Sequence, residues 1–396
     1  MRSYMRAGST QEKGELRNMN ILYTATVLSH ICQFHLPHMK ALQERGWSVH
    51  VAAHDNLAVK NGLKLRYCDR FIETPFDRSP KSPNNVKAYR QLKKLLAEEH
   101  YDVILCNTPM GGIVTRLAAK KARKRGTKVV YMAHGFHFFK GSSKKNWLVY
   151  YPIEKHMARL CDLVITVNEE DYELAKERFG KRTRVERIHG VGVDEGRYHH
   201  PALPAEQLAM RAAEGLTESD FAILCTGELN DNKDQSTLIR AAAMIRDELP
   251  GLKVLLAGNG PKEGELHALI KELGLEDTVR LLGYRTDLER VTPAVDLIVS
   301  CSHREGMPLN IIEAMLCKKP VVASHNRGHD ELVSDETGAL IPAGDARGFA
   351  EAVLSYAKDP EKRAIAGERG AVRAAPYSVG EVKKEFARIL EGLTER

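Results

Sequence analysis

The sequence predicts an α/β protein with two α/β/α domains, each built on a doubly wound parallel sheet, that face each other across a cleft. Two observations lead to this prediction. The chain has 396 residues, and about 150 are expected per domain, so two or three domains are indicated. From Met19 onward short apolar segments alternate with amphipathic ones, and the alternation starts again near residue 221. Alternating strands and helices favour parallel sheets with right-handed crossovers.

In the first half, six segments are short and partly β-branched, as buried parallel strands are. They are Asn20–Thr24, Val49–Ala53, Val103–Cys106, Lys128–Met132, Leu163–Val167 and Val185–Ile188. Helical patterns lie between them, at Phe34–Arg45, Val86–Glu98 and Ile113–Lys124. These segments make up a predicted first domain of residues 19–195. The polar residues 1–18 carry both charge signs and no apolar core of a secretion signal, so we expect a disordered extension there.

The second half repeats the pattern. The predicted strands are Phe221–Thr226, Lys253–Ala257, Val279–Leu282, Leu297–Ser300, Val321–Ala323 and Ala339–Ile341. The predicted helices are Gln235–Leu249, Lys262–Leu273, Asn310–Leu316 and Gly348–Tyr356. A segment rich in Gly, Pro and His at Gly190–Pro204 is typical of a linker between domains. The second domain is therefore expected at residues 196–377, with a last helix at about 378–396 that packs back on the first domain.

Charge and cysteine content narrow the function classes. Residues 1–200 hold 35 Lys and Arg against 20 Asp and Glu, whereas the remainder holds 24 against 32. This asymmetry suggests two domains with different partners, although a solvated basic surface explains the charge equally well. No recognition motif for nucleic acid is visible, and the acidic second half disfavours a long polyanion in the cleft. Seven cysteines without a Cys-x-x-Cys pair indicate neither a disulfide framework nor a zinc knuckle, and favour a reducing compartment.

Ligands of open α/β sheets bind at the carboxyl ends of the strands, so we searched the loops that follow them. The most specific segment begins at Ser302 and runs into a helix that starts near Pro308. Glu305 precedes this helix and Glu313 lies eight positions on, a little over two turns, so both carboxylates can point at one ligand. The free amides of Gly306, Met307, Leu309 and Asn310 can form an anion site at the helix N-terminus. An N-capping acid plus a solvated glutamate is the plainer interpretation.

Two further loops carry candidate side chains. The Gly- and Asn-rich loop that begins at Gly227 ends in Lys233, before the helix at Gln235, and this placement presents an ammonium group to a phosphate. Taken alone, a lysine in a loop is more often solvated. The strand at Lys128–Met132 ends at His134, which puts an imidazole at the edge of the first domain that faces the cleft. A buried histidine bonded to the backbone is the alternative.

Taken in order, these motifs resemble those of the retaining family 4 glycosyltransferases, whose two Rossmann-like domains form the fold called GT-B. The resemblance covers nearly the whole chain from Met19. It rests on the two glutamates, the Gly227–Lys233 loop, Ala-Gly-Asn-Gly at Ala257–Gly260, Val-Gly-Val-Asp at Val191–Asp194, and His-Gly at 134–135. The variant at Ala133–Phe139, together with Gly-Glu-Leu-Asn at Gly227–Asn230, looks like the branch that builds bacterial capsule and exopolysaccharide repeat units.

The resemblance implies roles for individual residues. Glu313 would hold the ribose of a nucleotide sugar, and Glu305 the hydroxyls of its sugar ring. Lys233 and the amides near the helix would bind the diphosphate, and the backbone near Tyr284 the base. His134 would hydrogen-bond the donor sugar near the reacting carbon. The expected catalytic residues are thus His134, Glu305 and Lys233, and the donor-binding residues are Glu313, Gly306, Met307, Pro308, Leu309, Asn310, Tyr284, Gly227 and Asn232.

The chain departs from the family pattern at two places. Glu228 stands where family members commonly have Arg, so we expect that Glu228 turns away from the phosphates or that Arg304 or Arg327 replaces the charge. The Gly-Gly pair that usually follows the first strand is also absent, and Thr24–Ile31 stands in its place. This second loop is expected to face the acceptor, so the identity of the acceptor is what it puts in doubt.

The implied reaction breaks the anomeric C–O bond of a nucleotide sugar, and electrostatic stabilisation of the leaving diphosphate should supply most of the catalysis. The sequence contains no Asp-x-Asp motif, so we expect no metal and no cofactor, with Lys233 and the helix N-terminus in the place of a cation. The resemblance implies retention of configuration, and we favour front-face attack through an ion pair. In that mechanism the departing phosphate oxygen accepts the proton of the acceptor.

Two basic stretches raise the question of a membrane. Residues 113–128 hold a cluster of Arg and Lys, and residues 136–151 interleave Lys with Phe, Trp and Tyr. Such stretches suit the headgroup region of an anionic bilayer, although a solvated helix face and core aromatics are the alternatives. No apolar run approaches the roughly 20 residues of a membrane-spanning helix. A cytoplasmic enzyme at the inner face of the cell membrane would fit these features.

The sequence thus predicts a hexosyl- or N-acetylhexosaminyltransferase. Its donor would be a nucleotide sugar, a UDP-sugar by the family branch, and its acceptor a lipid-linked saccharide of capsule or exopolysaccharide synthesis. A sugar-nucleotide epimerase, a phosphorylase or another enzyme of the same fold is the alternative. A basic nucleic-acid-binding protein is a remote one.

Overall fold

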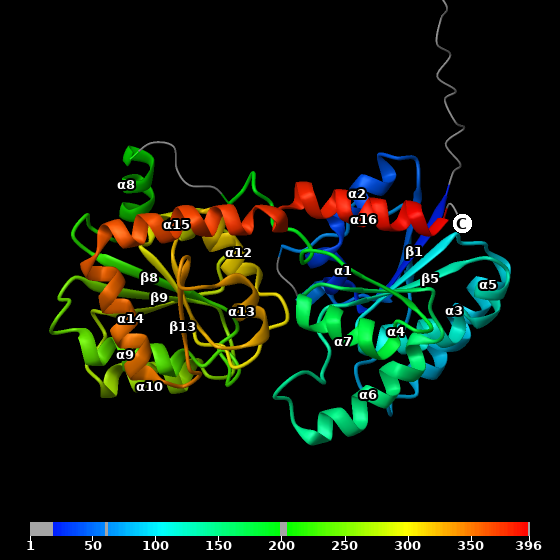
Figure 1. The fold of residues 1–396 in the computed structure, drawn as a ribbon, viewed down its shortest axis with the longest axis horizontal. Helices are drawn as coiled ribbons and strands as arrows, with labels where there is room; N and C mark the ends of the chain where they lie inside the picture. Colours follow the sequence, from blue (N-terminus) through cyan, green and yellow to red (C-terminus); the bar gives the residue numbers. More distant parts are fainter. Residues whose placement is uncertain (1–18, 60–61, 199–203, 395–396) are drawn as a thin grey trace, which may run out of the picture.

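The computed structural model describes residues 19–59, 62–198 and 204–394, so the extension expected at residues 1–18 lies outside the described residues. Two α/β/α domains stand side by side (Figure 1). The predicted fold class is confirmed, and both sheets are entirely parallel. All twelve predicted strands form within the two sheets.

The first sheet has seven strands in the order β3-β2-β1-β4-β5-β6-β7. Their bounds are β1 Asn20–Val27, β2 Ser48–His54, β3 Arg70–Glu73, β4 Val103–Asn107, β5 Lys128–Ala133, β6 Leu163–Thr166 and β7 Arg184–Arg187. The central strands β4, β5 and β6 are almost wholly buried. Their continuous apolar stretches are what a parallel sheet covered on both faces requires. The edge strand β3 was missed because two of its four residues are charged and none is buried.

The helices of the first domain are α1 Leu28–Phe34, α2 Leu36–Gln43, α3 Asn84–Glu98, α4 Pro109–Ala118, α5 Lys120–Lys124, α6 Lys144–Ala158 and α7 Glu169–Phe179, with a 3-10 turn η1 at Leu57–Val59. The single helix predicted at Phe34–Arg45 is wrong, because the chain is helical from Leu28 and breaks at His35. Pro37 explains the break, since proline lacks the amide hydrogen and clashes with the preceding turn. The helix predicted at Ile113–Lys124 likewise divides into α4 and α5.

The second sheet has six strands in the order β10-β9-β8-β11-β12-β13. They are β8 Phe221–Thr226, β9 Leu252–Ala257, β10 Val279–Gly283, β11 Leu297–Ser300, β12 Val321–Ser324 and β13 Gly338–Ile341. The helices are α8 Pro204–Ala213, α9 Gln235–Ile245, α10 Glu263–Glu272, α11 Leu288–Ala294, α12 Leu309–Leu316, α13 Arg327–Leu332, α14 Ala346–Lys358 and α15 Pro360–Ala374, followed by η2 Ala375–Tyr377. All four predicted helices are present.

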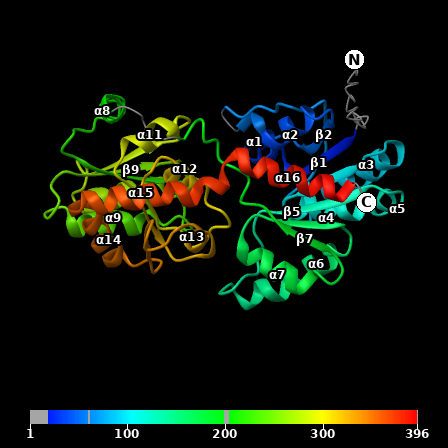
Figure 2. The same cartoon turned by 45° about the horizontal axis from the view of Figure 1, so that its top comes forward.

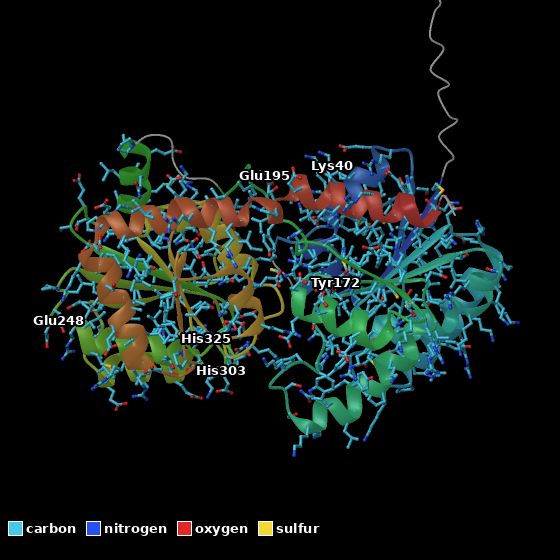
Figure 3. The ribbon with its side chains drawn as sticks, in the orientation of Figure 1. Lys40, Tyr172, Glu195, Glu248, His303 and His325 are labelled. Carbon is cyan, nitrogen blue, oxygen red and sulfur yellow. The ribbon has the colours of Figure 1, made fainter. Side chains whose placement is uncertain are left out.

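The last helix, α16 (Val379–Thr394), crosses back to the first domain. Its residues Val382, Phe386 and Leu390 share a buried cluster with the strands of the first sheet. Figure 2 shows α15 and α16 running one after the other along both domains. Glu195, labelled in Figure 3, lies beside the start of α16 at the junction of the domains. The chain therefore links its two domains twice, once after β7 and once through α16.

Charged side chains also connect the domains. The Arg327 guanidinium at the start of α13 pairs with the Asp171 carboxylate of α7 at 2.6 Å, and both side chains are almost fully buried. Glu331 receives hydrogen bonds from the Arg187 side chain and from the Glu169 amide of the first domain. Breaking one partner of a buried ion pair is costly because the other charge stays buried and unpaired. These contacts hold the carboxyl ends of the two sheets against each other.

Candidate active site

The turn between β11 and α12 carries the two glutamates and an uncapped helix N-terminus. Pro308 is the N-cap residue of α12, and no side chain accepts a hydrogen bond from the helix amides there. The first amides of a helix carry its positive dipole end and bind anions. Glu305 and Glu313 line one cavity of about 820 Å³ together with this turn. Both carboxylates thus line one cavity, and that they bind one ligand stays a prediction.

Lys233 reaches Glu305 from the neighbouring loop. Its ammonium Nζ lies 2.5 Å from Glu305 Oε1, and the two side chains are 22% and 15% exposed. Gly227 makes this reach possible, because its φ is +149° and an added Cβ would lie 2.9 Å from Lys233 Cε. The loop that begins with Gly227 thus delivers an ammonium group to the turn that precedes α12.

Most of the predicted donor-binding residues and two of the predicted catalytic ones line this same cavity. They are Gly227, Lys233, Tyr284, Glu305, Met307, Pro308, Leu309, Asn310 and Glu313. The Tyr284 ring is 58% exposed at the mouth of the cavity, beyond the end of β10. The sequence placed these residues in three separate loops, and the topology brings them together because β8, β10 and β11 all end at one edge of the sheet.

Two predicted donor residues do not line the cavity. The Asn232 side chain donates to the Arg304 carbonyl at 3.1 Å, so it braces the loop before Glu305 and is not among the residues that line the cavity. Gly306 lies instead against the first domain, where an added Cβ would be 2.6 Å from the His134 carbonyl oxygen. Any larger residue at 306 would therefore push the two domains apart.

Burial controls the protonation of Glu313. Removal from solvent raises the pKa of this carboxyl group to about 7, and a hydrogen bond with Tyr198 opposes the rise. A carboxyl group that titrates near neutral pH can exchange its proton for hydroxyl donors when a ligand arrives. Perturbed pKa values of this kind are concentrated at functional sites.

His134 follows β5 directly and sits on the opposite side of the cleft. Burial lowers its pKa well below the usual value, so the imidazole is neutral. Its Nε2 lies 3.3 Å from the side-chain oxygen Oδ1 of Asn107 and 3.2 Å from His30 Nε2. The side-chain nitrogen Nδ2 of Asn107 donates to the Thr24 carbonyl, which orients Oδ1 toward His134. Asn107 thus favours the His134 tautomer with its proton on Nε2.

His134 lines a second cavity, which lies in the first domain. This cavity measures about 680 Å³, and its apolar wall includes Ile113, Phe136, Phe138, Val149 and Ile153. Gln33 borders both cavities, so the two adjoin at the cleft. The site therefore consists of a polar cavity in the second domain and an apolar one in the first, with His134 between them.

Glu228 stands where the family commonly has Arg, and the structure shows where Glu228 and the two arginines expected to replace that charge lie. Glu228 lines the polar cavity, exposed to solvent, and its carboxylate accepts a hydrogen bond from Asn230 at 3.0 Å. Arg327 does not supply the missing charge, because its guanidinium is bound to Asp171 and to the Phe136 carbonyl. Arg304 does not line this cavity either.

Sequence reasoning missed several residues of the polar cavity. Arg285 lines it while paired with Glu214 and Asp287 at 2.8 and 2.7 Å, and Asn259 and Phe34 also contribute. Arg285 follows Tyr284 after a strand end, which was the signal available. Phe34 gave no signal, since it belongs to the first domain and reaches the cavity only through the packing of the domains.

The two stretches expected at a membrane are corrected in part. Arg116 is fully buried, where it pairs with Glu154 and stacks over the Tyr131 ring at 3.9 Å. Phe136 and Phe138 are core residues, 4% and 0% exposed. In contrast, α6 exposes an apolar set of Leu148, Val149, Tyr150 and Ile153. No described helix combines the length and the apolar composition needed to cross a bilayer.

Comparison with known proteins identifies the family. The model of Glycosyltransferase Family 4 matches residues 38–197, and that of Glycosyl transferases group 1 matches residues 206–373. The protein named glycosyltransferase EpsD in Bacillus subtilis (strain 168) is 42% identical over 372 residues, which are 93% of this chain and 95% of the relative. The chain belongs to the family 4 glycosyltransferases. The domain matched by the first model carries His134, and the domain matched by the second carries both glutamates.

Other relatives support this assignment. A galactosyltransferase of Escherichia coli, named UDP-Gal:alpha-D-GlcNAc-diphosphoundecaprenol alpha-1,3-galactosyltransferase, is 30% identical over 69% of this chain and 71% of its own length. Among solved structures, the Anabaena protein HepE in complex with UDP and glucose superposes with a TM-score of 0.75 at 24% identity, covering 94% of this chain and all of that one. The sucrose-phosphate synthase of Thermosynechococcus elongatus reaches 0.76 at 21% identity, with 95% and 99% covered. These two structures share the fold of this glycosyltransferase.

Proposed function

We propose that this glycosyltransferase moves a hexose or N-acetylhexosamine from a UDP-sugar to a lipid-linked saccharide, with retention of configuration, in capsule or exopolysaccharide synthesis. The observation that carries the proposal is the polar cavity, where Lys233, Glu305, Glu313 and the N-terminus of α12 converge. An ammonium group and free helix amides suit a diphosphate, and two carboxylates suit the hydroxyls of two sugar rings.

In this proposal Glu313 binds the ribose. A carboxylate accepts hydrogen bonds from both hydroxyls of a diol only when it is ionised. Because burial holds the pKa of Glu313 near 7, the incoming ribose would stabilise the ionised form and draw the proton off. Tyr198 would remain as a third donor to the same carboxylate. The backbone beside Tyr284, at the mouth of the cavity, would receive the base.

The diphosphate would be held by protein groups, with no metal required. Lys233 is paired with Glu305, so a diphosphate would compete for its ammonium group and release the Glu305 carboxylate toward the sugar hydroxyls. As the anomeric C–O bond breaks, the leaving phosphate gains charge. Lys233 and the helix amides would stabilise it, since preorganised donors cost no reorganisation at that moment.

Retention would follow from attack on the same face from which the diphosphate leaves. The acceptor oxygen forms a bond to the anomeric carbon, the bond to the phosphate oxygen breaks, and that phosphate oxygen takes the proton of the acceptor hydroxyl. Neutral His134 would hydrogen-bond the donor sugar from the first domain. Gly306 packs against the His134 backbone carbonyl, so the His134 backbone lies next to the turn that carries Glu305.

The acceptor would enter through the first domain. Its apolar cavity of about 680 Å³ adjoins the polar one and ends near α6, whose exposed Leu148, Val149, Tyr150 and Ile153 are flanked by Lys144 and Lys145. An apolar surface beside basic residues suits the edge of an anionic bilayer. The Escherichia coli relative is named for a diphosphoundecaprenol acceptor. A place at the cytoplasmic face of the membrane would fit such an acceptor and the reducing compartment that the absence of a Cys-x-x-Cys pair favours.

The decisive experiment measures nucleoside diphosphate release from a panel of nucleotide sugars, with and without lipid-linked saccharides. Transfer predicts release that depends on the acceptor, together with a product of unchanged anomeric configuration by NMR. Rapid conversion of the donor alone to a stereoisomer would favour an epimerase. Release of sugar phosphate with inorganic phosphate would favour a phosphorylase. A donor present at a hundred times its Kd should also stabilise the fold by about 2.7 kcal/mol in a thermal-shift assay.

A further inference from the structure

A carboxylate lies in the wall of the apolar cavity, where the proposed reaction gives it no role. Glu154 belongs to α6 and lines this cavity together with Val149, Tyr150 and Ile153. These residues share one face of the helix, since positions three or four apart are neighbours there. Among the described residues that line the cavity, Glu154 is the only acidic one. Its side chain is 11% exposed, and a carboxylate so nearly buried needs an explanation.

The partner of Glu154 is Arg116 of α4, the helix that lies beside α6 in both views (Figures 1 and 2). The Arg116 side chain is wholly buried, and both of its terminal nitrogens donate to the same carboxylate oxygen, Oε2, at 3.1 Å. Replacing a buried ion pair by apolar side chains is often neutral or stabilising. Stability alone is therefore a weak reason for a buried pair at the wall of a cavity.

The other oxygen of Glu154, Oε1, keeps free capacity for hydrogen bonds. Its one hydrogen-bond partner among the described residues is the Tyr131 hydroxyl, at 3.4 Å. A carboxylate has about four sites that accept hydrogen bonds, and Arg116 uses two of them at Oε2. Tyr131 lines the apolar cavity and Arg116 does not, which indicates that Oε1 is the oxygen on the cavity side of the pair.

Several other polar groups of the cavity are already engaged or lie in solvent. The hydroxyls of Thr26 and Thr108 bond to each other at 2.7 Å. Gln33 and Arg78 are exposed, so water competes for their hydrogen bonds. Glu154 is thus a buried acceptor with spare capacity in a largely apolar wall, and a few polar groups placed in this way orient a bound ligand.

We propose that Glu154 binds a hydroxyl group of the acceptor saccharide, with Arg116 holding its carboxylate in position. This inference rests on the proposed function, because it takes the ligand of the apolar cavity to be the acceptor. An ionised carboxylate can only accept hydrogen bonds, and hydroxyl groups are the donors that a saccharide offers. Glu154 would thereby select acceptors by the position of one hydroxyl, whereas the apolar wall contributes contact without direction.

The test uses the whole chain and a set of octyl glycosides, each with one hexose or N-acetylhexosamine and an apolar chain, below the concentration at which they form micelles. Calorimetry gives the Kd of the glycoside that binds best and of each of its monodeoxy analogues. We expect one deoxy analogue to bind at least about tenfold more weakly, as loss of a hydrogen bond to a charged group implies. Absence of glycoside binding, or equal binding of all deoxy analogues, would overturn the proposal.

Variants assign this hydroxyl to Glu154. In the double variant Arg116→Met/Glu154→Leu, which removes both charges, the difference between the glycoside and its deoxy analogue should vanish. Glu154→Gln, which keeps the shape, should reduce the difference to a few-fold, because a hydrogen bond to a neutral group is weaker. Circular dichroism and thermal unfolding show which variants are folded. The same tenfold difference in a folded variant and in the wild type would overturn the proposal.

Asp162→Asn is the matched control. Asp162 pairs with Arg123 at 2.9 Å in the same domain, and neither residue lines the apolar or the polar cavity. This variant should keep the full difference between the glycoside and its deoxy analogue. Loss of the difference here as well would show that weakening any ion pair of the domain disturbs the cavity, and would overturn the role of Glu154.

Glycoside binding requires no donor, so failure of this inference and failure of the proposed function are distinguishable. In the transfer reaction, Glu154→Gln should raise the acceptor KM and leave the donor KM unchanged. Acceptor-dependent release of nucleoside diphosphate, without any link between Glu154 and one hydroxyl, would overturn the inference and leave the transferase standing. A hydroxyl bound through Glu154, without transfer from any nucleotide sugar, would support the saccharide site and refute the transferase.

Discussion

The two cavities of this glycosyltransferase are similar in size and differ in the side chains that line them. The one in the second domain, about 820 Å³, is lined by two glutamates, a lysine and a helix N-terminus. The one in the first domain, about 680 Å³, is lined more by Phe, Ile, Val and Tyr side chains, together with polar ones such as His134 and Arg78. Polar groups fix the orientation of a small ligand through directional hydrogen bonds. Apolar contact has no preferred direction, and its strength depends on the area that is buried. In the proposed reaction the cavity of the second domain would be the donor side, where orientation is fixed, and that of the first domain the acceptor side, where apolar contact dominates.

The largest expected effect separates the two glutamates of the donor side. Glu305→Gln should lower kcat by about 10²–10³-fold, the range for loss of one group that stabilises developing charge. Glu313→Gln should chiefly raise KM, because the ribose does not change during the reaction. Steady-state kinetics at varied donor concentration distinguishes the two. Equal kcat losses with KM untouched would show that the roles are assigned wrongly.

Lys233→Ala should weaken donor binding by about 1.5–3 kcal/mol, which is roughly 10- to 150-fold in Kd. The lysine would no longer bind the diphosphate, and the Glu305 carboxylate would lose its partner at 2.5 Å. Calorimetric titration with the donor and with the free nucleoside measures the effect. The nucleoside serves as the control, because it lacks the diphosphate. An unchanged donor Kd would remove Lys233 from the site.

The membrane prediction tests the acceptor side alone. Leu148→Glu should reduce binding to anionic vesicles by about tenfold, or about 1.5 kcal/mol of lost apolar burial, without changing donor affinity. Leu148 is 79% exposed on α6, and Val372, 76% exposed on α15 of the other domain, provides the matched control Val372→Glu. Cosedimentation with phosphatidylglycerol vesicles measures both. Equal losses in the two variants would contradict a binding surface on α6.

Donor affinity should depend on pH through Glu313. Its pKa in the folded protein is raised to about 7, so the carboxyl is mostly protonated at pH 6 and mostly ionised at pH 8. Ribose binding favours the ionised form, and affinity should therefore rise as pH increases through 7, by up to about tenfold per unit below the pKa. The donor diphosphate keeps a constant charge in this range. Titrations of Glu313→Gln should lack this dependence; a dependence that persists would assign it to another group.

Removal of divalent metal ions is expected to have no effect on donor affinity. Donor affinity should be the same after treatment with EDTA and without added Mg²⁺ or Mn²⁺, because the proposed ligands of the diphosphate are all protein groups. Calorimetry on treated and untreated protein measures this directly. Restoration of lost donor binding by Mg²⁺ would refute the metal-free account of the diphosphate.

Much of the fold could be predicted from the sequence, because buried parallel strands are continuous apolar segments that stand out from their neighbours. The predictions failed where local pattern and environment disagree. The exposed edge strand β3 has no apolar alternation, and Pro37 divides a helix that its apolar periodicity joins. Helices α6 and α7 were missed. For α6 the reason is that its aromatic and basic residues were interpreted as a membrane surface.

The sequence by itself determined which loops are candidates for the chemistry, since Glu305, Lys233 and His134 each follow a recognisable strand. Only the tertiary structure decided which side chains meet. The Lys233–Glu305 pair, the Arg327–Asp171 contact and the His30–His134 pair join residues 72, 156 and 104 positions apart. Such pairs depend on how the sheets twist and how the domains pack. Burial in the fold then raises the pKa of Glu313 and removes Arg116 from the surface. The sequence does not show how much solvent the fold will remove from a charged side chain, and this desolvation determines its pKa.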